Sequence, residues 1–507
     1  MRLLHRHAPH IAVAALALAY AWPMQGVGFN QSSHYILVKS LARGTAVVDR
    51  TLHETGDLTT EDVIRLNGHI YSNKAPGLAA VTLPPFLVLE AAGARTVGDP
   101  TRMLWALGLF GAVLPATALL LLVRRVAARI EPGFGTVTAV TLGAATLLMP
   151  FATLFFAHAL SAFLVFASFA ILFAERHGRQ RLALVAVAGL LAGLAGVTEY
   201  PNAFAALVFG VYALSRSGWA LRGLAYLVGV LVGLAPLALY NRWAFGSFTH
   251  LSYVGDAVPG GGLKAPRVGR FDLETLLETL FGRVGLLTLA PVLVCGVVGL
   301  VLLYRRGWRA EALVIAATAA LYVLYNASYG SNFGGFSAGQ RYLIPIVPLL
   351  AVPLALAFRS FPITTGALAL VSAVVAVTIT PTYALAAYDG RWFDNLGDLQ
   401  FTPTPASLVG VTGWYTILPF FLAVAVAGVC AFIATPKPHL TALDTLAAPV
   451  AVLAWALVAA TAPATPFLGG QADRLSAYWG LALAAAALST SAVAASAFRY
   501  RRARARS

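Results

Sequence analysis

Long apolar runs recur along most of this chain, and they are the feature that most limits how it can fold. Runs of about 18–22 residues are long enough to cross about 30 Å of hydrocarbon as an α-helix. Hydrophobic residues make up 59% of the 507 residues and charged residues only 11%, whereas a soluble domain carries about 25% charged residues. The sequence therefore predicts an all-α, polytopic membrane protein with about 14 spans, forming a single integral membrane domain over residues 1–507.

The positive charge of the chain is explained by membrane topology rather than by nucleic-acid binding. The formal net charge is +15, and the arginines gather in short connectors between apolar runs, as they do in cytoplasmic loops. We therefore predict a protein of the cytoplasmic membrane with both termini on the cytoplasmic side, in contact with membrane lipids and with no nucleic-acid partner. The connectors predicted to be cytoplasmic are 1–7, 124–129, 175–179, 305–306 and 499–506.

The longer polar segments are then predicted to face outside. They are residues 28–100, 243–284, 328–341, 384–412 and 463–475.

One apolar run, residues 76–95, does not fit this charge pattern as a span. It contains Pro84 and Pro85, which break the helical hydrogen-bond ladder, and also Glu90. A crossing here would place the arginines of 124–129 outside. We predict that 76–95 lies along or dips into the outer face without crossing; the alternative is an ordinary span that breaks the charge rule.

The first external loop gathers much of the chain's acidity. Five of the 20 acidic residues lie between residues 28 and 74. Imidazoles, phenols and an ammonium group accompany them on a turn-rich frame with glycines at 56, 68 and 77. This mixture suits general-base chemistry and the binding of an anionic group such as phosphate; the alternative is a solvated loop. Its candidate residues are Asp49, Asp57, His69, Tyr71 and Lys74.

Within the same loop, Ser33 to Ala42 has an apolar side that includes Tyr35 and Leu37. We expect this segment to form an amphipathic helix on the membrane surface.

An acid ends one apolar run on the predicted outer side. Glu199 lies in the sequence Gly-Val-Thr-Glu-Tyr-Pro-Asn, followed by Tyr200, and a carboxylate inside a span is functional by default because its insertion is costly. The alternative is a residue at the water boundary. His158 also falls at an outer span boundary, where an interfacial histidine is the competing interpretation.

A glycine-rich stretch precedes an arginine at another outer helix start. The planar guanidinium of Arg341 and the backbone N–H groups of a helix start both favour anions, although a plain interfacial anchor is the alternative. Asn332, Gln340 and Tyr342 flank Arg341 and are further candidates for substrate binding. The chain has no nucleotide-binding fingerprint and no spacing that requires a metal, so ATP-driven transport is disfavoured.

The pattern resembles the GT-C class of membrane glycosyltransferases, which includes protein mannosyltransferases and lipid A aminoarabinose transferases. The resemblance is carried by the long first external loop with its acids, by the sequence YSNKAPG at 71–77 with Pro84-Pro85, and by GGFSAGQRY at 334–342. It implies horizontal helices in the first loop. The sequence departs from the class at Asn30, near the position where members carry an early acid.

The resemblance implies transfer of a sugar from a polyprenyl-phosphate donor to an acceptor outside the cytoplasmic membrane. Arg341, Lys74 and Tyr342 would bind the donor phosphate, and Asp49 or else Asp57 would be the base, assisted by Glu199. The substrate would meet His69, Tyr71, His158, Tyr200, Asn332 and Gln340. No cofactor is required, and a divalent metal is an open alternative. The competing functions are a transporter or flippase of a lipid-linked substrate and a non-catalytic assembly subunit.

Overall fold

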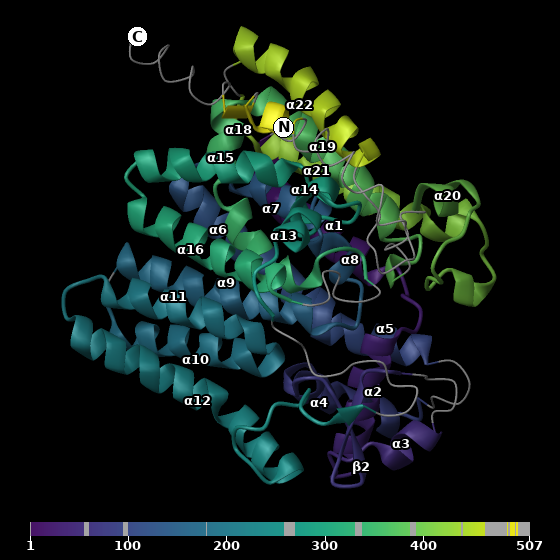
Figure 1. Cartoon of the computed structure of the whole chain (residues 1–507). Helices are drawn as coiled ribbons and strands as arrows, with labels where there is room; N and C mark the ends of the chain where they lie inside the picture. Colours follow the sequence, from purple (N-terminus) through teal and green to yellow (C-terminus); the bar gives the residue numbers. More distant parts are fainter. Residues whose placement is uncertain are drawn as a thin grey trace. The chain divides into compact units, whose positions relative to one another are not determined.

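The computed structural model confirms an all-α membrane protein with one small sheet (Figure 1). Its described residues form two compact units. Unit 1 comprises Met1–Pro23, Thr117–Pro150 and Arg270–Ser507, and unit 2 comprises Met24–Ala116 and Phe151–Gly269. The structure describes residues 2–54, 60–94, 100–178, 180–257, 269–329, 337–385, 392–437, 440–461, 484, 487–491 and 493–494.

Unit 2 contains the first external loop and a group of long helices. The loop elements are α2 (Phe29–Ala42), α3 (Asp49–Glu54), β1 (Val63–Leu66), β2 (His69–Ser72) and α4 (Gly77–Ala91). They are followed by α5 (Thr101–Gly108), a π-helical turn η1 (Leu109–Val113) and the start of α6 (Leu114–Ile130). The remaining elements are α9 (Ala157–Arg176), α10 (Leu182–Thr198), η2 (Tyr200–Asn202), α11 (Ala203–Leu214), α12 (Trp219–Phe245) and β3 (Asp256–Ala257).

Helices α10 and α12 pack backbone to backbone because glycines face each other at spacings of four residues. A Cβ built on Gly229 would lie 2.0 Å from the backbone oxygen of Ala186, and one on Gly193 would lie 2.4 Å from that of Val230. Small residues four apart permit this approach, which supplies dispersion contacts where lipid gives no hydrophobic drive between helices. The close seam fixes α10, whose last residue precedes Glu199.

Adding one methyl group to this seam is expected to destabilise the protein. For Gly229→Ala we expect a loss of about 1–3 kcal/mol, because the backbone of α10 must move away from the new Cβ. The matched control is Gly428→Ala in α21 (Trp414–Ala434), where nothing lies within 4 Å of the added Cβ; its effect should be neutral or stabilising. The melting temperatures of the two purified variants test this, and equal values would contradict the described packing.

Unit 1 begins with α1 (Arg2–Ala21), which packs along α21 and α7 (Gly135–Ala144). Its other helices are α6, α8 (Leu148–Phe151, which ends at the boundary with unit 2), α13 (Leu273–Phe281), α14 (Leu286–Leu289), α15 (Val292–Arg305), α16 (Arg309–Ala327), η3 (Arg341–Ile346), α17 (Val347–Ala351), α18 (Leu354–Ser360), α19 (Pro362–Ile379), α20 (Trp392–Gly397), η5 (Ser407–Val409) and α22 (Ala442–Thr461). Asp444 stabilises the start of α19, since its carboxylate accepts the backbone N–H groups of Ile363 and Thr364 at 2.7 and 2.9 Å.

Ion pairs around a buried carboxylate join helix ends within each unit. In unit 2, Arg222 makes a two-pronged ion pair with Glu175 at 2.6 and 2.7 Å, so the connectors around these residues meet. In unit 1, Arg306 and Arg359 both bind Glu131, which follows the arginines of 124–129. In unit 1, the arginine-rich segments 124–129 and 305–306 therefore end close together. The cytoplasmic side assigned to them stays a prediction.

The described residues include seven helices that are long and apolar enough to cross a membrane, or up to nine if each of two bent pairs is one span. The predicted total of about 14 spans stays a prediction. Two of the expected spans, α10 and α11, have 17 and 12 residues and reach only roughly 26 and 18 Å. They meet at Glu199, where the backbone is extended.

Helix α2 of the first loop is buried, whereas the sequence predicts a helix on the membrane surface. Helix α2 is buried on nearly every side, including the polar residues from Asn30 to His34, so it does not expose a polar face. Gln31 shows why: its side-chain oxygen accepts the backbone N–H of Phe155 at 2.9 Å, and its side-chain nitrogen donates to the carbonyl of Gly26.

The run 76–95 contains α4, whose 15 residues rise roughly 22 Å, less than the thickness of a bilayer core. Its non-spanning placement stays a prediction.

Candidate functional site

A β-hairpin organises the first external loop. Strands β1 and β2 are antiparallel, with Leu66 paired with His69 and Val63 with Ser72, and β3 adds to the other edge of β1. Asn67 and Gly68 form the turn with φ of 51° and 83°, the left-handed conformations that an Asn-Gly type I′ turn needs. This register brings the residues that flank the hairpin, Asp62 and Asn73, to the same end. There the backbone N–H of Asn73 donates to the backbone carbonyl of Asp62 at 3.1 Å.

The flanks of the hairpin carry a buried ion pair. Lys74 Nζ lies 2.8 Å from Asp62 Oδ2, and the two side chains are only 12% and 8% exposed. Removal from water strengthens their attraction but also makes either charge costly without the other. Lys74 was predicted to bind phosphate; the structure gives its ammonium a fixed carboxylate partner, and two of its three N–H donors can still serve another anion.

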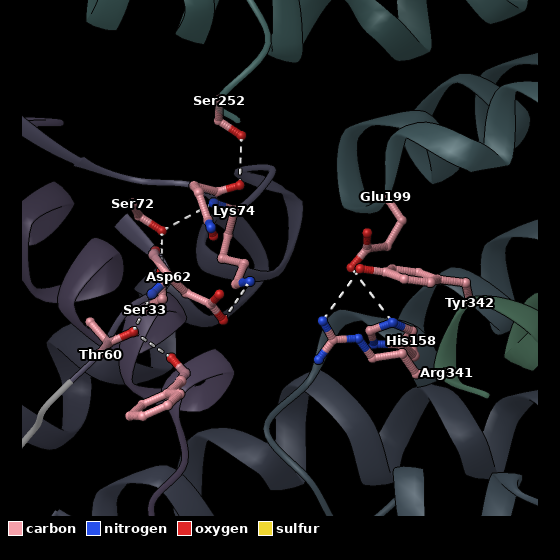
Figure 2. A network of polar contacts seen from close by, with 12 residues as sticks. Ser33, Thr60, Asp62, Ser72, Lys74, His158, Glu199, Ser252, Arg341 and Tyr342 are labelled. Atoms are coloured by element: carbon pink, nitrogen blue, oxygen red, sulfur yellow. Dashed lines mark hydrogen bonds and ion pairs between the residues drawn. The ribbon is translucent and has the colours of Figure 1, made fainter. Parts of the chain in front are cut away.

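Hydroxyl groups hold this pair in position (Figure 2). Ser33 on α2 donates to the carbonyl of Asp62 at 2.6 Å and shares a 2.7 Å hydrogen bond with Ser72. Ser72 in turn accepts the backbone N–H of Lys74 at 3.2 Å. Because Ser33 lies on the buried helix α2, the position of the ion pair is fixed by the core of unit 2 rather than by a mobile loop.

A second acidic group lies where α10 ends. Glu199 is the residue after α10, with extended backbone, and Pro201 in the next turn prevents the helix from continuing. Its Oε1 is 3.9 Å from Nε2 of His158, a buried residue in the first turn of α9. The exposed fraction of the Glu199 side chain is 18%. Glu199 and His158, which the sequence analysis names separately as candidates, thus lie near each other at two helix ends (Figure 2).

The hairpin flank and the end of α10 are in direct contact. A Cβ on Gly77 would lie 2.7 Å from the backbone oxygen of Val197 and 2.8 Å from Thr198, so only glycine lets the chain after Lys74 pass this close. Ser252 completes the link, because its hydroxyl donates to the carbonyl of Asn73 at 3.0 Å and lies 3.0 Å from the hydroxyl of Tyr200. Lys74 and Glu199 therefore lie at one end of unit 2, on segments that touch.

The predicted acid Asp49 has a different environment. Its Oδ2 accepts the backbone N–H of Ile70 at 2.9 Å and lies 3.8 Å from Nδ1 of His69, whose side chain is 60% exposed. Asp49 thus ties the start of α3 to strand β2. Tyr71 on the same strand packs its ring against Phe245, and burial together with the charge of Asp49 raises the pKa of its phenol.

The remaining predicted residues belong to unit 1 or lie outside the described residues. Arg341 begins η3 and is buried, and its guanidinium lies 3.3 Å from the hydroxyl of Tyr342. Gln340 beside it is also buried. Asp57 and Asn332 lie outside the described residues. The roles predicted for all of these residues stay predictions.

No group of three or more His, Cys, Asp or Glu residues that could hold a metal occurs in the described part of the chain.

Sequence reasoning missed Asp62 as a partner of Lys74, and it missed Ser33, Ser72 and Ser252. A signal for the ion pair was present: an Asn-Gly turn between two short β-prone segments predicts a two-residue hairpin. Counting outward from that turn places residue 62 opposite residue 73, next to Lys74. No local sequence pattern predicts the contact of Ser252 with Asn73, because the two residues are 179 positions apart along the chain.

No family model and no curated protein matches this sequence. Among solved structures, the chain is similar to ArnT from Cupriavidus metallidurans in the apo state, with 15% identity, a TM-score of 0.44, and coverage of 96% of this chain and 74% of that one. The same protein bound to undecaprenyl phosphate gives 16% identity, a TM-score of 0.41, and coverage of 97% and 76%.

The oligosaccharyltransferase of Archaeoglobus fulgidus in its apo form is also similar, with 14% identity and a TM-score of 0.43. The match covers 83% of this chain and 64% of that protein, so the chain spans less than two thirds of its length.

Proposed function

We propose that this protein is a membrane glycosyltransferase, which moves a sugar from a polyprenyl-phosphate donor to an acceptor on the outer side of the cytoplasmic membrane. The observation that supports the proposal is that a cation on the first loop, Lys74, and a carboxylate at a helix break, Glu199, lie on segments of unit 2 that touch each other. The donor class follows from the resemblance of residues 71–77 and 334–342 to GT-C enzymes.

The chemistry assigned to this end of unit 2 is acid–base catalysis with charge stabilisation. Glu199 accepts the proton of the acceptor hydroxyl as its oxygen forms a bond to the anomeric carbon of the sugar. The bond between that carbon and the donor phosphate oxygen breaks, and polyprenyl phosphate leaves with the bonding electrons. Lys74, oriented by Asp62, stabilises the charge that develops on the leaving phosphate.

His158 is assigned a role in positioning Glu199, and Asp49 is assigned a structural role. The imidazole of His158 lies 3.9 Å from the carboxylate of Glu199 and is assigned the role of orienting it in the complex with substrate. Asp49, which the sequence favoured as base, is engaged with the backbone of Ile70, so we assign proton removal to Glu199. Asp57 stays the alternative base.

Transfer of label from polyprenyl-phosphate sugars tests this function. The purified protein would be reconstituted into vesicles with a panel of labelled donors, and a cell-envelope fraction would supply the acceptor. We expect one donor to pass its label to the acceptor with wild type and Asp49→Asn, and not with Glu199→Gln. Full activity of Glu199→Gln together with loss of activity in Asp57→Asn would move the base to Asp57; full activity in both would overturn the assigned site.

A further inference from the structure

Unit 1 contains a basic cavity that has no part in the proposed transfer reaction. Its volume is about 490 Å³, within the range of small-molecule sites. Three arginines of the last turns of α6, namely Arg124, Arg125 and Arg129, line it. The other lining residues are small or weakly polar, and no acid is among them: Pro9, Ala128, Gly133, Gly135, Thr136 and Ala434.

Two glycines shape this cavity. A Cβ on Gly135 would lie 2.3 Å from the backbone oxygen of Arg124, so only glycine allows α7 to begin directly against α6. Gly133 has φ of +90°, and a Cβ there would lie 2.5 Å from Pro436, which follows α21. The first residues of α7, Gly135 and Thr136, therefore line the same cavity as the arginines. The backbone N–H groups of a helix start favour negative charge.

Among the described residues, the arginines of the cavity have no carboxylate partner, unlike other arginines of this protein. Arg222 is paired with Glu175, and Arg306 with Glu131. Over the described ranges, no ion pair joins Arg124, Arg125 or Arg129 to a carboxylate. The Nε of Arg124 is buried and has no hydrogen-bond partner there. Three adjacent cations without an internal anion repel one another, so an external anion would stabilise them.

We propose that this cavity binds the phosphate group of an anionic membrane lipid. Phosphate suits the planar forks of the arginines and the helix start of α7. Two of the contributing helices, α21 and the continuous segment Thr101–Ile130 that ends in α6, are long and apolar enough to span. We expect the ends of such spans to lie at headgroup level, where basic pockets between helices bind lipid phosphates. The positive-inside rule would account for the positive charge of residues 124–129, but it does not account for a cavity lined by their side chains.

Lipid titration of the purified full-length protein, followed by native mass spectrometry, tests this site. Phosphatidylglycerol is the anionic probe, and phosphatidylcholine is the neutral comparison. The variant is Arg125→Ala/Arg129→Ala, which removes two exposed side chains and should leave the melting temperature unchanged. The matched control is Arg102→Ala/Arg181→Ala, which removes two exposed arginines elsewhere.

We expect phosphatidylglycerol to bind the cavity variant about tenfold to thirtyfold more weakly than wild type, from about 1 kcal/mol for each cation near a lipid surface. The control variant should bind like wild type. Equal binding by wild type and the cavity variant, or an equal loss in the control, would overturn the site. A parallel thermal-stability assay with inorganic phosphate identifies the source: stabilisation of wild type by phosphate, with displacement of the lipid, would overturn a lipid as the ligand.

Discussion

Replacement of Glu199 by glutamine is expected to lower kcat for sugar transfer by about 10²–10⁴-fold, the usual contribution of a positioned general base. Glutamine keeps the size of the side chain and its place at the end of α10, but it cannot accept the proton of the acceptor hydroxyl. The KM for the donor should change little, because the donor phosphate is assigned to Lys74 rather than to Glu199.

The control for this variant is Glu54→Gln. Glu54 belongs to the same unit, and its hydrogen bonds from Arg43 and Arg50 lower the pKa of its carboxyl to about 2. It lies on α3, away from the assigned chemistry, so its amide variant should transfer sugar at the wild-type rate. The test is the kcat of both variants, measured by steady-state kinetics at saturating donor. Equal kcat values for the two variants would contradict the role of Glu199.

Replacement of Lys74 by methionine is expected to reduce both stability and transfer. Methionine retains the apolar stem and removes the charge, which leaves the carboxylate of Asp62 buried without its cation. Breaking a buried ion pair in this way costs about 3–5 kcal/mol. A large fall in melting temperature should follow, along with the loss of donor turnover.

A second substitution separates these two effects. In Asp62→Asn/Lys74→Met the buried charge is gone from both partners, so most of the lost stability should return. Transfer should stay lost, because the cation assigned to the leaving phosphate, Lys74, is absent. Melting temperature and transfer rate would be measured on wild type, both single variants and the double variant. Recovery of transfer along with stability would show that Lys74 serves only to neutralise Asp62.

The membrane fold could be predicted because long apolar runs and arginine-rich connectors are local signals. The ion pair of Glu131 with Arg306 joins the ends of two arginine-rich segments to which the sequence assigns the same side, and that side stays a prediction. The burial of α2 could not be predicted, since its polar residues are satisfied by distant groups, as Gln31 is by Phe155. The spacing of apolar residues within one segment carries no information about hydrogen-bond partners that are distant in the sequence.

The site was predicted in part for the same reason. Glu199 and His158 were each singled out as polar groups at span boundaries, but only the packing of α9 beside α10 brings them within 3.9 Å. The role of Lys74 stays a prediction, and its pairing with Asp62 depends on the register of a hairpin, which the sequence analysis does not consider. The contact between that hairpin and α10 depends on Gly77, whose significance appears only in three dimensions.

The fate of the donor lipid tests the central claim most directly. Vesicles containing the purified protein, a polyprenyl-phosphate sugar and the acceptor fraction would be extracted, and the lipids would be identified by mass spectrometry. We predict that wild type converts the donor to polyprenyl phosphate only when acceptor is present, and that Glu199→Gln does not. Passage of intact donor from one leaflet to the other, with no polyprenyl phosphate formed, would contradict a transferase and indicate a transporter.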